Sequence, residues 1–187
     1  MNVELTELPG VLIITPRVFQ DARGFFFESY NFAQFRMHGI DTIFVQDNHS
    51  RSIRDTLRGL HFQLPPMAQD KLVRCVHGAI WDVAVDIRVG SPTFGRWVGV
   101  ELSAENYRQL YVPGYFAHGF CVLSDEAEVL YKAGAVYSPM QERGIAWDDP
   151  QLAITWPVTE PLLSDRDRGA PSLADYLAAT PLVYEAH

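Results

Sequence analysis

The amino-acid sequence predicts an all-β fold, either a sandwich or a barrel. Most of its 187 residues fall into short apolar, aromatic or β-branched segments of the kind that form strands. Residues 80–87 alternate strictly, with aspartates and an alanine on one face and valines and an isoleucine on the other, which predicts a half-buried strand. Turn-forming sequences such as Gly90-Ser91-Pro92 separate the segments, a spacing typical of sandwiches and barrels.

The expected strands follow one another along the chain with a turn between neighbours. Each is a short run of residues that favour extended backbone, bounded by glycine, proline, serine or asparagine. The expected strands are residues 11–15, 24–30, 43–45, 57–63, 71–76, 80–87, 96–102, 109–112, 119–123 and 128–132.

Two short helices complete the expected secondary structure. Residues 32–38 follow Asn31, whose side chain can cap a helix, and precede Gly39, which favours a helix end. A second short helix is expected at residues 172–178. The segment after Trp156 is richer in proline and charge, and we expect it to wrap around the barrel.

The length fits one domain with a substantial core. We therefore expect a single domain over residues 1–187, with its core at about 10–157 and a C-terminal wrap at 158–187. The net charge of -8 argues against binding to nucleic acid, which needs a basic face. A small anionic ligand is compatible with this charge, because a few local arginines can outweigh the global sign.

The composition also bears on where the protein works. The sequence has no stretch of the ~20 apolar residues that a membrane span requires, and it begins without a signal-peptide pattern. Its two cysteines, Cys75 and Cys121, match no metal-binding spacing, and we expect both to be buried thiols. These features favour a cytoplasmic protein that does not bind membranes.

The most informative segment is LRGLHFQ at residues 57–63, followed ten positions after its histidine by Lys71. Arg58 and His61 are three residues apart and would point to opposite faces of an ideal strand. A β-bulge at Gly59 would bring them to one face, and the sequence alone leaves both arrangements open.

These residue types suit removal of a proton next to a ketone. Such a reaction needs a base, a donor that stabilises the enolate oxygen, and an acid that returns a proton. His61 can be the base, Lys71 the donor and Tyr131 the acid. Asp167 is a candidate for the carboxylate that orients the histidine, although composition alone favours a solvated polar loop at residues 163–167.

Two other features bear on ligands. Arg23 and Arg58 each offer a guanidinium fork that can bind phosphate. Metal-binding proteins of the double-stranded β-helix type carry two histidines one residue apart, but here the sequence reads His61-Phe62-Gln63. An amide is a poor ligand for Zn, Fe or Mn, so we expect no metal site, and a metal-dependent oxygenase is the less favoured alternative.

Taken together, the motifs of this chain resemble the dTDP-4-dehydrorhamnose 3,5-epimerase family from about Gly10 to Leu177. The motifs occur in a fixed order: QDNHS, LRGLHFQ, QDKLVR, DVAVDIR, SPTFG, LSAEN, FAHGF, LYK, YSP, ERGIAWDDP and LSDRD. The resemblance implies a cupin-like double-stranded β-helix, or jelly roll, with a few short helices, that dimerises by exchanging N-terminal strands. It also implies an enzyme without metal or cofactor that inverts C3 and C5 of dTDP-4-dehydro-6-deoxy-D-glucose.

The resemblance further implies roles for individual residues. His61 matches the catalytic base and Asp167 its partner. Tyr131 matches the proton donor and Lys71 the group that stabilises the enolate. Arg23 matches a pyrophosphate contact that would come from the second subunit. The full set of implied substrate-binding positions is Arg23, Phe26, Glu28, Gln46, Asn48, Arg58, His118, Tyr137, Glu142 and Arg166.

The chain departs from the family pattern at three places. Residues 133–136 read Ala-Gly-Ala-Val where a Thr-Asp pair is common, Arg166 stands where a lysine is common, and Pro113-Gly114 shifts a turn glycine. These departures leave two alternatives open. The chain could invert only one carbon, as in secondary-metabolite pathways, or it could bind a nucleotide sugar without turnover.

Overall fold

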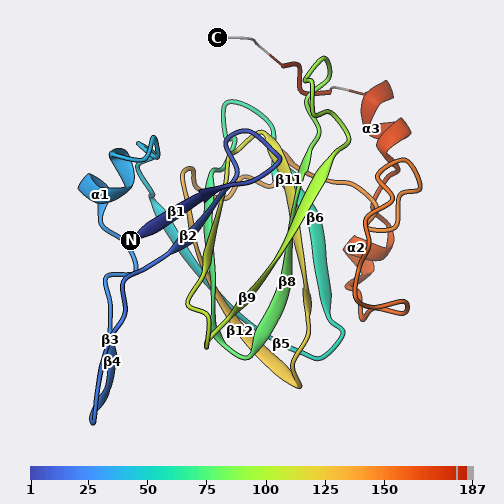
Figure 1. Cartoon of the computed structure of the whole chain (residues 1–187). Coiled ribbons are helices and arrows are strands. Elements are labelled where there is room, and N and C mark those ends of the chain that lie inside the picture. Colours follow the sequence, from blue (N-terminus) through green and yellow to red (C-terminus); the bar gives the residue numbers. More distant parts are fainter. Residues whose placement is uncertain (180, 185–187) are drawn as a thin grey trace.

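The computed structural model describes residues 1–179 and 181–184 and contains two facing antiparallel sheets (Figure 1). In spatial order, the six-stranded sheet contains β1 (Asn2–Leu5), β2 (Leu12–Thr15), β10 (Gln109–Val112), β7 (Lys71–His77), β12 (Glu126–Ala133) and β5 (Gln46–Ile53). The five-stranded sheet contains β13 (Glu142–Gly144), β6 (Leu57–Gln63), β11 (Phe116–Val122), β8 (Ala79–Asp86) and β9 (Trp97–Ser103). Most consecutive strands lie in different sheets, which confirms the expected jelly roll.

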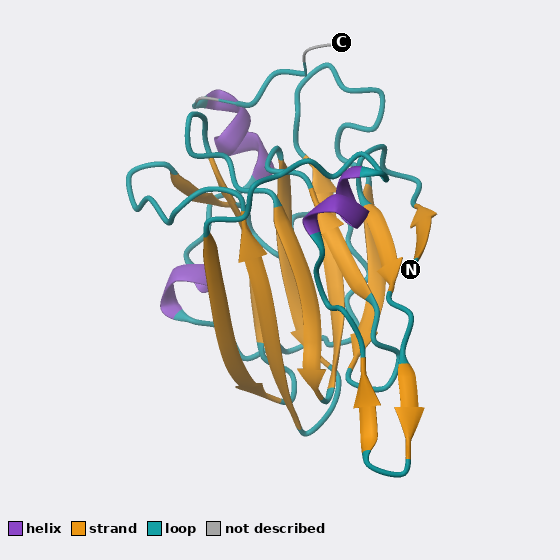
Figure 2. Cartoon of the chain, turned by 90° about the vertical axis from the view of Figure 1, so that its left-hand side faces the viewer, coloured by secondary structure: helices purple, strands orange, loops and turns teal. Residues whose placement is uncertain are grey.

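A separate hairpin of β3 (Phe19–Asp21) and β4 (Gly24–Phe26) projects away from the two sheets (Figures 1 and 2). Every residue of both strands is exposed, including Phe25 and Phe26. The strand expected over residues 24–30 ends at Phe26, because the chain then leaves the hairpin and pairs with no other strand.

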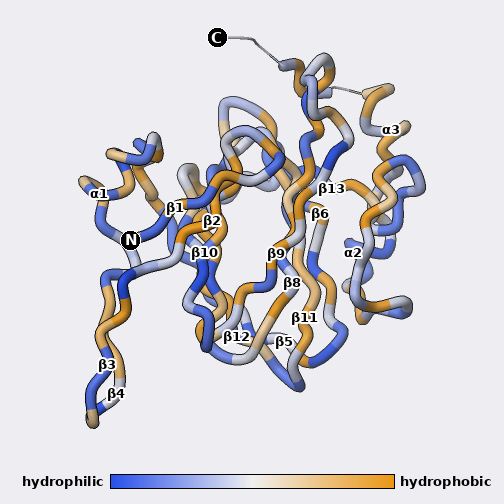
Figure 3. The backbone as a smooth tube through the Cα atoms, viewed as in Figure 1, coloured by the Kyte–Doolittle hydropathy of each residue, from blue (hydrophilic) through white to orange (hydrophobic). Residues whose placement is uncertain are grey.

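Three apolar clusters stabilise the fold by burial. The first lies between the sheets and includes Val73, Leu110 and Phe120. The second lies on the outer face of the five-stranded sheet, and the third on the outer face of the six-stranded sheet, where Phe35 of α1 (Phe32–Arg36) is buried. Figure 3 shows hydrophobic residues along the strands of both sheets and in the C-terminal segment around α3 (Leu173–Ala178).

The second cluster overturns one expectation. Residues 80–87 alternate as predicted, but Asp82, Val83 and Asp86 are all fully buried, so the strand is not half-buried. The valine face packs against the C-terminal segment. In the same cluster the ring of Tyr176, from that segment, contacts the Phe62 ring in an edge-to-face arrangement at a centroid distance of 5.3 Å. The opposite face points into the space between the sheets, where the aspartates need polar partners.

Most expected strands are confirmed to within a few residues, and residues 57–63 and 109–112 are confirmed without change. The expectation for residues 43–45 is wrong. They form a loop, and the strand begins at Gln46, because its polar residues pair along β12 instead of packing in a core. Strands β1, β3 and β13 and the one-turn helix α2 (Asp165–Arg168) were not expected.

Both expected helices are present, and the first is capped as predicted. Asn31 caps α1 by accepting a hydrogen bond from the Gln34 amide at 3.3 Å. The helix ends two residues earlier than predicted, and Gly39 follows with φ +83°, a conformation that favours glycine. Ser172 caps α3.

The C-terminal segment runs over the five-stranded sheet, and the division between core and wrap stays a prediction. The Leu57 amide donates to Leu162 O at 3.1 Å, and Val183 bridges to Val89. His187 lies outside the described residues. None of the described helices is long and apolar enough to cross a bilayer.

Candidate active site

A cavity of about 460 Å³ lies between the two sheets and brings most of the expected site residues together. Strands β5, β7 and β12 form one wall, and strands β6, β11 and β13 form the other. Helix α2 and the loop before β13 close one side. Eleven of the expected residues line this cavity: Gln46, Asn48, Arg58, His61, Lys71, His118, Tyr131, Tyr137, Glu142, Arg166 and Asp167.

A β-bulge resolves the open question about Arg58 and His61. In the pairing of β6 with β11, His61 lies opposite His118 and Arg58 lies opposite Phe120, so two residues of β6 stand against the single Gly119 of β11. Gly59, with φ +130°, takes up the extra residue. The side chains of Arg58 and His61 therefore both line the cavity. Arg58 Nε donates to the Ser52 hydroxyl at 3.0 Å.

Gly59 is also required by a close approach of backbones. A Cβ at this position would lie 2.5 Å from Gly119 Cα and 2.9 Å from His118 O. No side chain can occupy that space, so the paired strands β6 and β11 approach each other closely at Gly59 and Gly119. The pairing places His61 directly opposite His118.

His61 and Asp167 form the pair predicted from the sequence. His61 Nε2 lies 2.5 Å from Asp167 Oδ1, and their side chains are 28% and 6% exposed. An ionised carboxylate can only accept, so the imidazole donates from Nε2 and leaves Nδ1 with a free lone pair. His61 is thus oriented in the way that a general base requires.

The position of Asp167 comes from the short helix α2. Ser164 precedes the helix and accepts a hydrogen bond from the Asp167 amide at 3.1 Å, while its hydroxyl donates to Asp167 Oδ2 at 2.9 Å. Burial alone would raise the pKa of Asp167, but the hydrogen bond and charge of His61, the Ser164 hydroxyl and Arg166 together lower it. Asp167 is therefore a carboxylate at neutral pH.

Lys71 enters the cavity from β7 on the opposite sheet. Its ammonium Nζ donates to His61 O at 3.2 Å. Burial lowers the pKa of Lys71 from its usual value to about 8, although Asp82 and Glu142 partly oppose that shift. A buried ammonium with this pKa stays charged at neutral pH and can stabilise a developing oxyanion.

Tyr131 lies on β12, where it pairs with Asn48 of β5. Burial raises the pKa of its phenol, Glu142 adds to the increase, and Arg58 opposes it. A phenol with a raised pKa carries its proton at neutral pH, so Tyr131 can donate one. Tyr131 reaches the cavity from the sheet opposite to that of His61.

At the mouth of the cavity, Glu142 bonds two other lining residues. Tyr137 OH donates to Glu142 Oε2 at 2.6 Å, and Arg166 contributes an ion pair to Glu142 Oε1 at 2.7 Å. The Tyr137 amide also donates to Gln46 Oε1 at 2.9 Å. Tyr137 is half exposed, so its ring can contact a flat ligand at the entrance.

A second histidine pair lies deeper in the same wall. His118 Nε2 lies 2.9 Å from Asp82 Oδ1, and the two side chains are 9% and 0% exposed. His118 lies directly opposite His61 in the register of the sheet. The cavity therefore has two neighbouring histidines, each with its own carboxylate.

Three expected residues do not reach this cavity in the single chain. Arg23, Phe26 and Glu28 are all exposed, and Arg23 lies at the tip of the projecting hairpin, where it pairs with Asp21 at 2.6 Å. The Arg23 side chain is 90% exposed. Within one chain the hairpin projects away from the two sheets (Figure 1), and none of these three residues lines the cavity.

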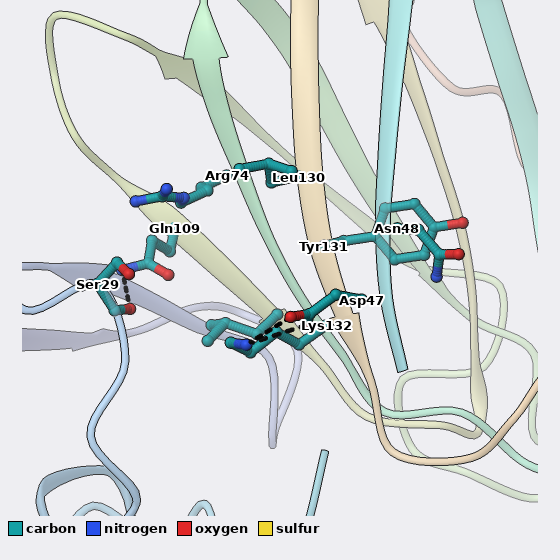
Figure 4. Close-up of a pocket in the computed structure, with 9 residues that line it drawn as sticks. Ser29, Asp47, Asn48, Arg74, Gln109, Leu130, Tyr131 and Lys132 are labelled. Carbon is teal, nitrogen blue, oxygen red and sulfur yellow. Dashed lines mark hydrogen bonds and ion pairs between the residues drawn. The ribbon is translucent and has the colours of Figure 1, made fainter. Parts of the chain in front are cut away.

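A smaller cavity of about 240 Å³ lies on the outer face of the six-stranded sheet (Figure 4). Arg74 and Gln109 line it together with an ion pair between Lys132 and Asp47. Figure 4 shows that Tyr131 points away from these residues. The two cavities therefore open on different faces of the same sheet.

Gln63 occupies the position where metal-binding relatives of this fold have a second histidine. Its side chain forms hydrogen bonds with the backbone of two loops. Its Nε2 donates to Met67 O at 2.6 Å and Val136 O at 3.2 Å, and its Oε1 accepts from the Ser138 amide at 2.7 Å.

Within the described residues, no group of three or more His, Cys, Asp or Glu side chains could hold a metal ion. Cys75 and Cys121 are buried free thiols, as expected.

Sequence reasoning missed two residues of the site. Ser164 holds Asp167, and its signal is the Ser-x-x-Asp spacing at residues 164–167, which is typical of a helix N-terminus. Asp82 was assigned to an exposed face because alternation does not distinguish solvent from a polar cavity.

Comparison with known proteins agrees with this geometry. The family model for dTDP-4-dehydrorhamnose 3,5-epimerase matches residues 5–175. The dTDP-4-dehydrorhamnose 3,5-epimerase of Shigella flexneri is 61% identical over 94% of this chain and 97% of its own length.

Solved structures give the same result. A dTDP-6-deoxy-D-glucose-3,5-epimerase from Legionella pneumophila, in complex with dTDP-4-keto-L-rhamnose, has a TM-score of 0.95 at 48% identity and covers 99% of both chains. A 3'-monoepimerase from Streptomyces bikiniensis, in complex with dTDP-quinovose, has a TM-score of 0.89 at 39% identity and covers 95% of this chain and 91% of its own. With its matching motifs, fold and cavity, this chain belongs to the dTDP-4-dehydrorhamnose 3,5-epimerase family.

Proposed function

We propose that this protein converts dTDP-4-dehydro-6-deoxy-D-glucose to dTDP-4-dehydro-L-rhamnose by inverting C3 and C5. One observation carries the assignment of roles: His61 and Tyr131 reach the same cavity from opposite sheets. A sugar ring between them would have a base on one face and an acid on the other. Loss of a proton from one face and its return on the other inverts a carbon centre.

The ketone at C4 makes the hydrogens at C3 and C5 acidic. In each step Nδ1 of His61 accepts the proton, and the electron pair moves to the ketone oxygen as an enolate. The Lys71 ammonium stabilises that oxygen, and Tyr131 OH delivers a proton to the opposite face of the same carbon. Proton exchange with solvent then restores neutral His61 and the Tyr131 phenol.

The remaining cavity residues would bind the nucleotide part of the substrate. Arg58 offers its guanidinium to the diphosphate, and Tyr137 offers its ring to the thymine. Gln46, Asn48, His118, Glu142 and Arg166 would complete the polar wall. This division matches the geometry, because the acid–base groups lie deep and Tyr137 lies at the mouth.

We further propose that the protein works as a cytoplasmic homodimer whose hairpin completes the site of the second subunit. Support comes from the exposed aromatic side chains of the hairpin, such as Phe25 and Phe26, which a monomer would leave in water. Exchange of the hairpin would bring Arg23, Phe26 and Glu28 to a neighbouring cavity. The two free cysteines are consistent with a reducing compartment.

Turnover in D2O tests the proposed reaction. Product isolated from D2O should carry deuterium at both C3 and C5, because each new proton comes from a group that exchanges with solvent. NMR spectroscopy of the product identifies the labelled carbons. Label at one carbon only would show a mono-epimerase, and an unlabelled, unchanged substrate would show a protein that binds without turnover.

A further inference from the structure

Ser164 makes two hydrogen bonds that together fix Asp167. Its hydroxyl donates to Asp167 Oδ2 at 2.9 Å and accepts from the Asp167 amide at 3.1 Å. The other carboxylate oxygen, Oδ1, accepts from His61. Both oxygens of the Asp167 carboxylate are therefore engaged, one on each side, and the side chain is 6% exposed.

The same sequence spacing occurs a second time, with a different result. Ser172 begins α3 as Ser164 begins α2, and Asp175 stands three residues after it. Asp175 Oδ2 accepts from both the Ser172 hydroxyl at 2.6 Å and the Ser172 amide at 3.2 Å, which closes a capping box. Asp175 is exposed and serves only the helix.

In α2 the carboxylate that would close such a box is turned toward the cavity instead. Among the described residues, the Asp167 side chain bonds the Ser164 hydroxyl and His61 but not the Ser164 amide. The Asp167 carboxylate thus accepts a hydrogen bond from His61 in place of the one that the Ser164 amide would donate in a complete box. A local helix-capping element has become a support for the histidine.

We propose that Ser164 is a positioning residue of the epimerase, one that holds the Asp167 carboxylate in the rotamer that orients His61. This inference rests on the proposed function, in which His61 is the base. A carboxylate held at one oxygen can rotate about its bond to Cβ, whereas one held at both oxygens cannot. Supports of this kind keep a reacting group within the narrow geometry that proton transfer needs.

Steady-state kinetics of Ser164→Ala provide the first test. We expect kcat to fall about tenfold with little change in KM, because hydrogen bonds to charged groups are worth about one to two powers of ten. Ser164→Thr should restore most of kcat, since it keeps the hydroxyl. Ser164 also lines the cavity. A rise in KM with unchanged kcat would overturn the inference and show direct contact with substrate.

Ser172→Ala is the matched control, because it removes the same kind of cap from a helix outside the cavity. It should lower stability without changing kcat. The comparison of kcat distinguishes the two variants, because only Ser164 bonds the Asp167 carboxylate. An equal fall of kcat in both variants, or no fall in Ser164→Ala, would contradict the inference.

A double-mutant cycle separates this inference from the proposed function. In an Asp167→Asn background, Ser164→Ala should have no further effect on kcat, because its action passes through the carboxylate. If Asp167→Asn alone kept full activity, the proposed role of the pair would fail. If Asp167→Asn were impaired but Ser164→Ala were fully active, or if the two effects simply added, only the role of Ser164 would fail.

Discussion

The two histidine–aspartate pairs of the cavity wall have the same chemistry but different surroundings. His61 is 28% exposed, and its carboxylate comes from a helical turn outside the sheet. His118 is 9% exposed, and Asp82 comes from the neighbouring strand β8 within the sheet. The outer pair can exchange protons with substrate and solvent, whereas the inner pair is enclosed. Surroundings, rather than residue type, therefore decide which histidine can act as a base.

The inner pair has a further charge relation that the outer pair lacks. Asp82 is fully buried, raises the pKa of Lys71 against the effect of burial, and has one oxygen without a hydrogen-bond partner among the described residues. A buried carboxylate of this kind stabilises nearby cations. The Asp82 carboxylate of the inner pair thus helps to keep the Lys71 ammonium charged, whereas the outer pair moves protons in the proposed reaction.

Replacement of the outer histidine should have the largest effect. His61→Asn should lower kcat by roughly 10²- to 10⁴-fold, the usual contribution of a general base, while affinity for dTDP stays close to that of the parent. Kinetics and calorimetric titration with dTDP measure the two quantities. His49→Asn is the matched control: His49 pairs with Glu128 on the protein surface, so its loss should leave kcat unchanged. Substantial turnover in His61→Asn would remove it as the base.

Replacement of the inner aspartate should act mainly on stability. Asp82→Ala leaves the buried His118 N–H without its acceptor, which should lower the free energy of unfolding by about 1–3 kcal/mol. Asp167→Ala should cost less stability, because water can reach the 28% exposed His61, but it should cost more turnover. Urea unfolding compares the two variants. The contrast between the pairs breaks down if Asp167→Ala proves the more destabilising.

The pH dependence of turnover should be centred on Lys71. Burial places its pKa at about 8, so the ammonium is present below that pH and lost above it. We expect kcat/KM to fall about tenfold per pH unit above about 8. The raised pKa of Tyr131 keeps that phenol from causing this limb. A flat profile up to pH 10 would exclude a charged Lys71 from the reaction.

The same group should affect stability in the opposite direction. Its folded pKa of about 8 lies below the usual 10.5, so between these values the unfolded chain holds a proton that the folded chain has released. The Lys71 contribution to the free energy of unfolding therefore rises with pH in this window. Urea unfolding of the parent and Lys71→Met at pH 7.5 and pH 10 isolates this contribution.

Much of the cavity could be predicted because its residues lie in strands with clear signals. Residues 57–63 and 71–76 carry apolar side chains that mark strands on their own, and they deliver Arg58, His61 and Lys71 to the site. The face of the sheet from which the Arg58 side chain projects could not be predicted, because a bulge depends on the partner strand as well as on glycine.

Other parts of the site had no local signal. Strand β5 is polar from Gln46 to Ser52, so its pairing with β12 is evident only in three dimensions. Residues 163–167 are a polar segment by composition, and only the packing of α2 beside β6 buries Asp167. Asp82 looks exposed in the sequence because a polar cavity and bulk water select the same residue types.

The close approach of β6 and β11 limits how this enzyme could be re-engineered. Gly59 and Gly119 leave no room for even one extra carbon, so the backbone that carries His61 and His118 cannot be altered at that point by substitution. Variants designed to accept bulkier sugar nucleotides would have to be sought at the entrance, where Tyr137 and Arg166 have space to change. A change at Arg166 would also act on Asp167, because Arg166 lowers the pKa of that carboxyl group.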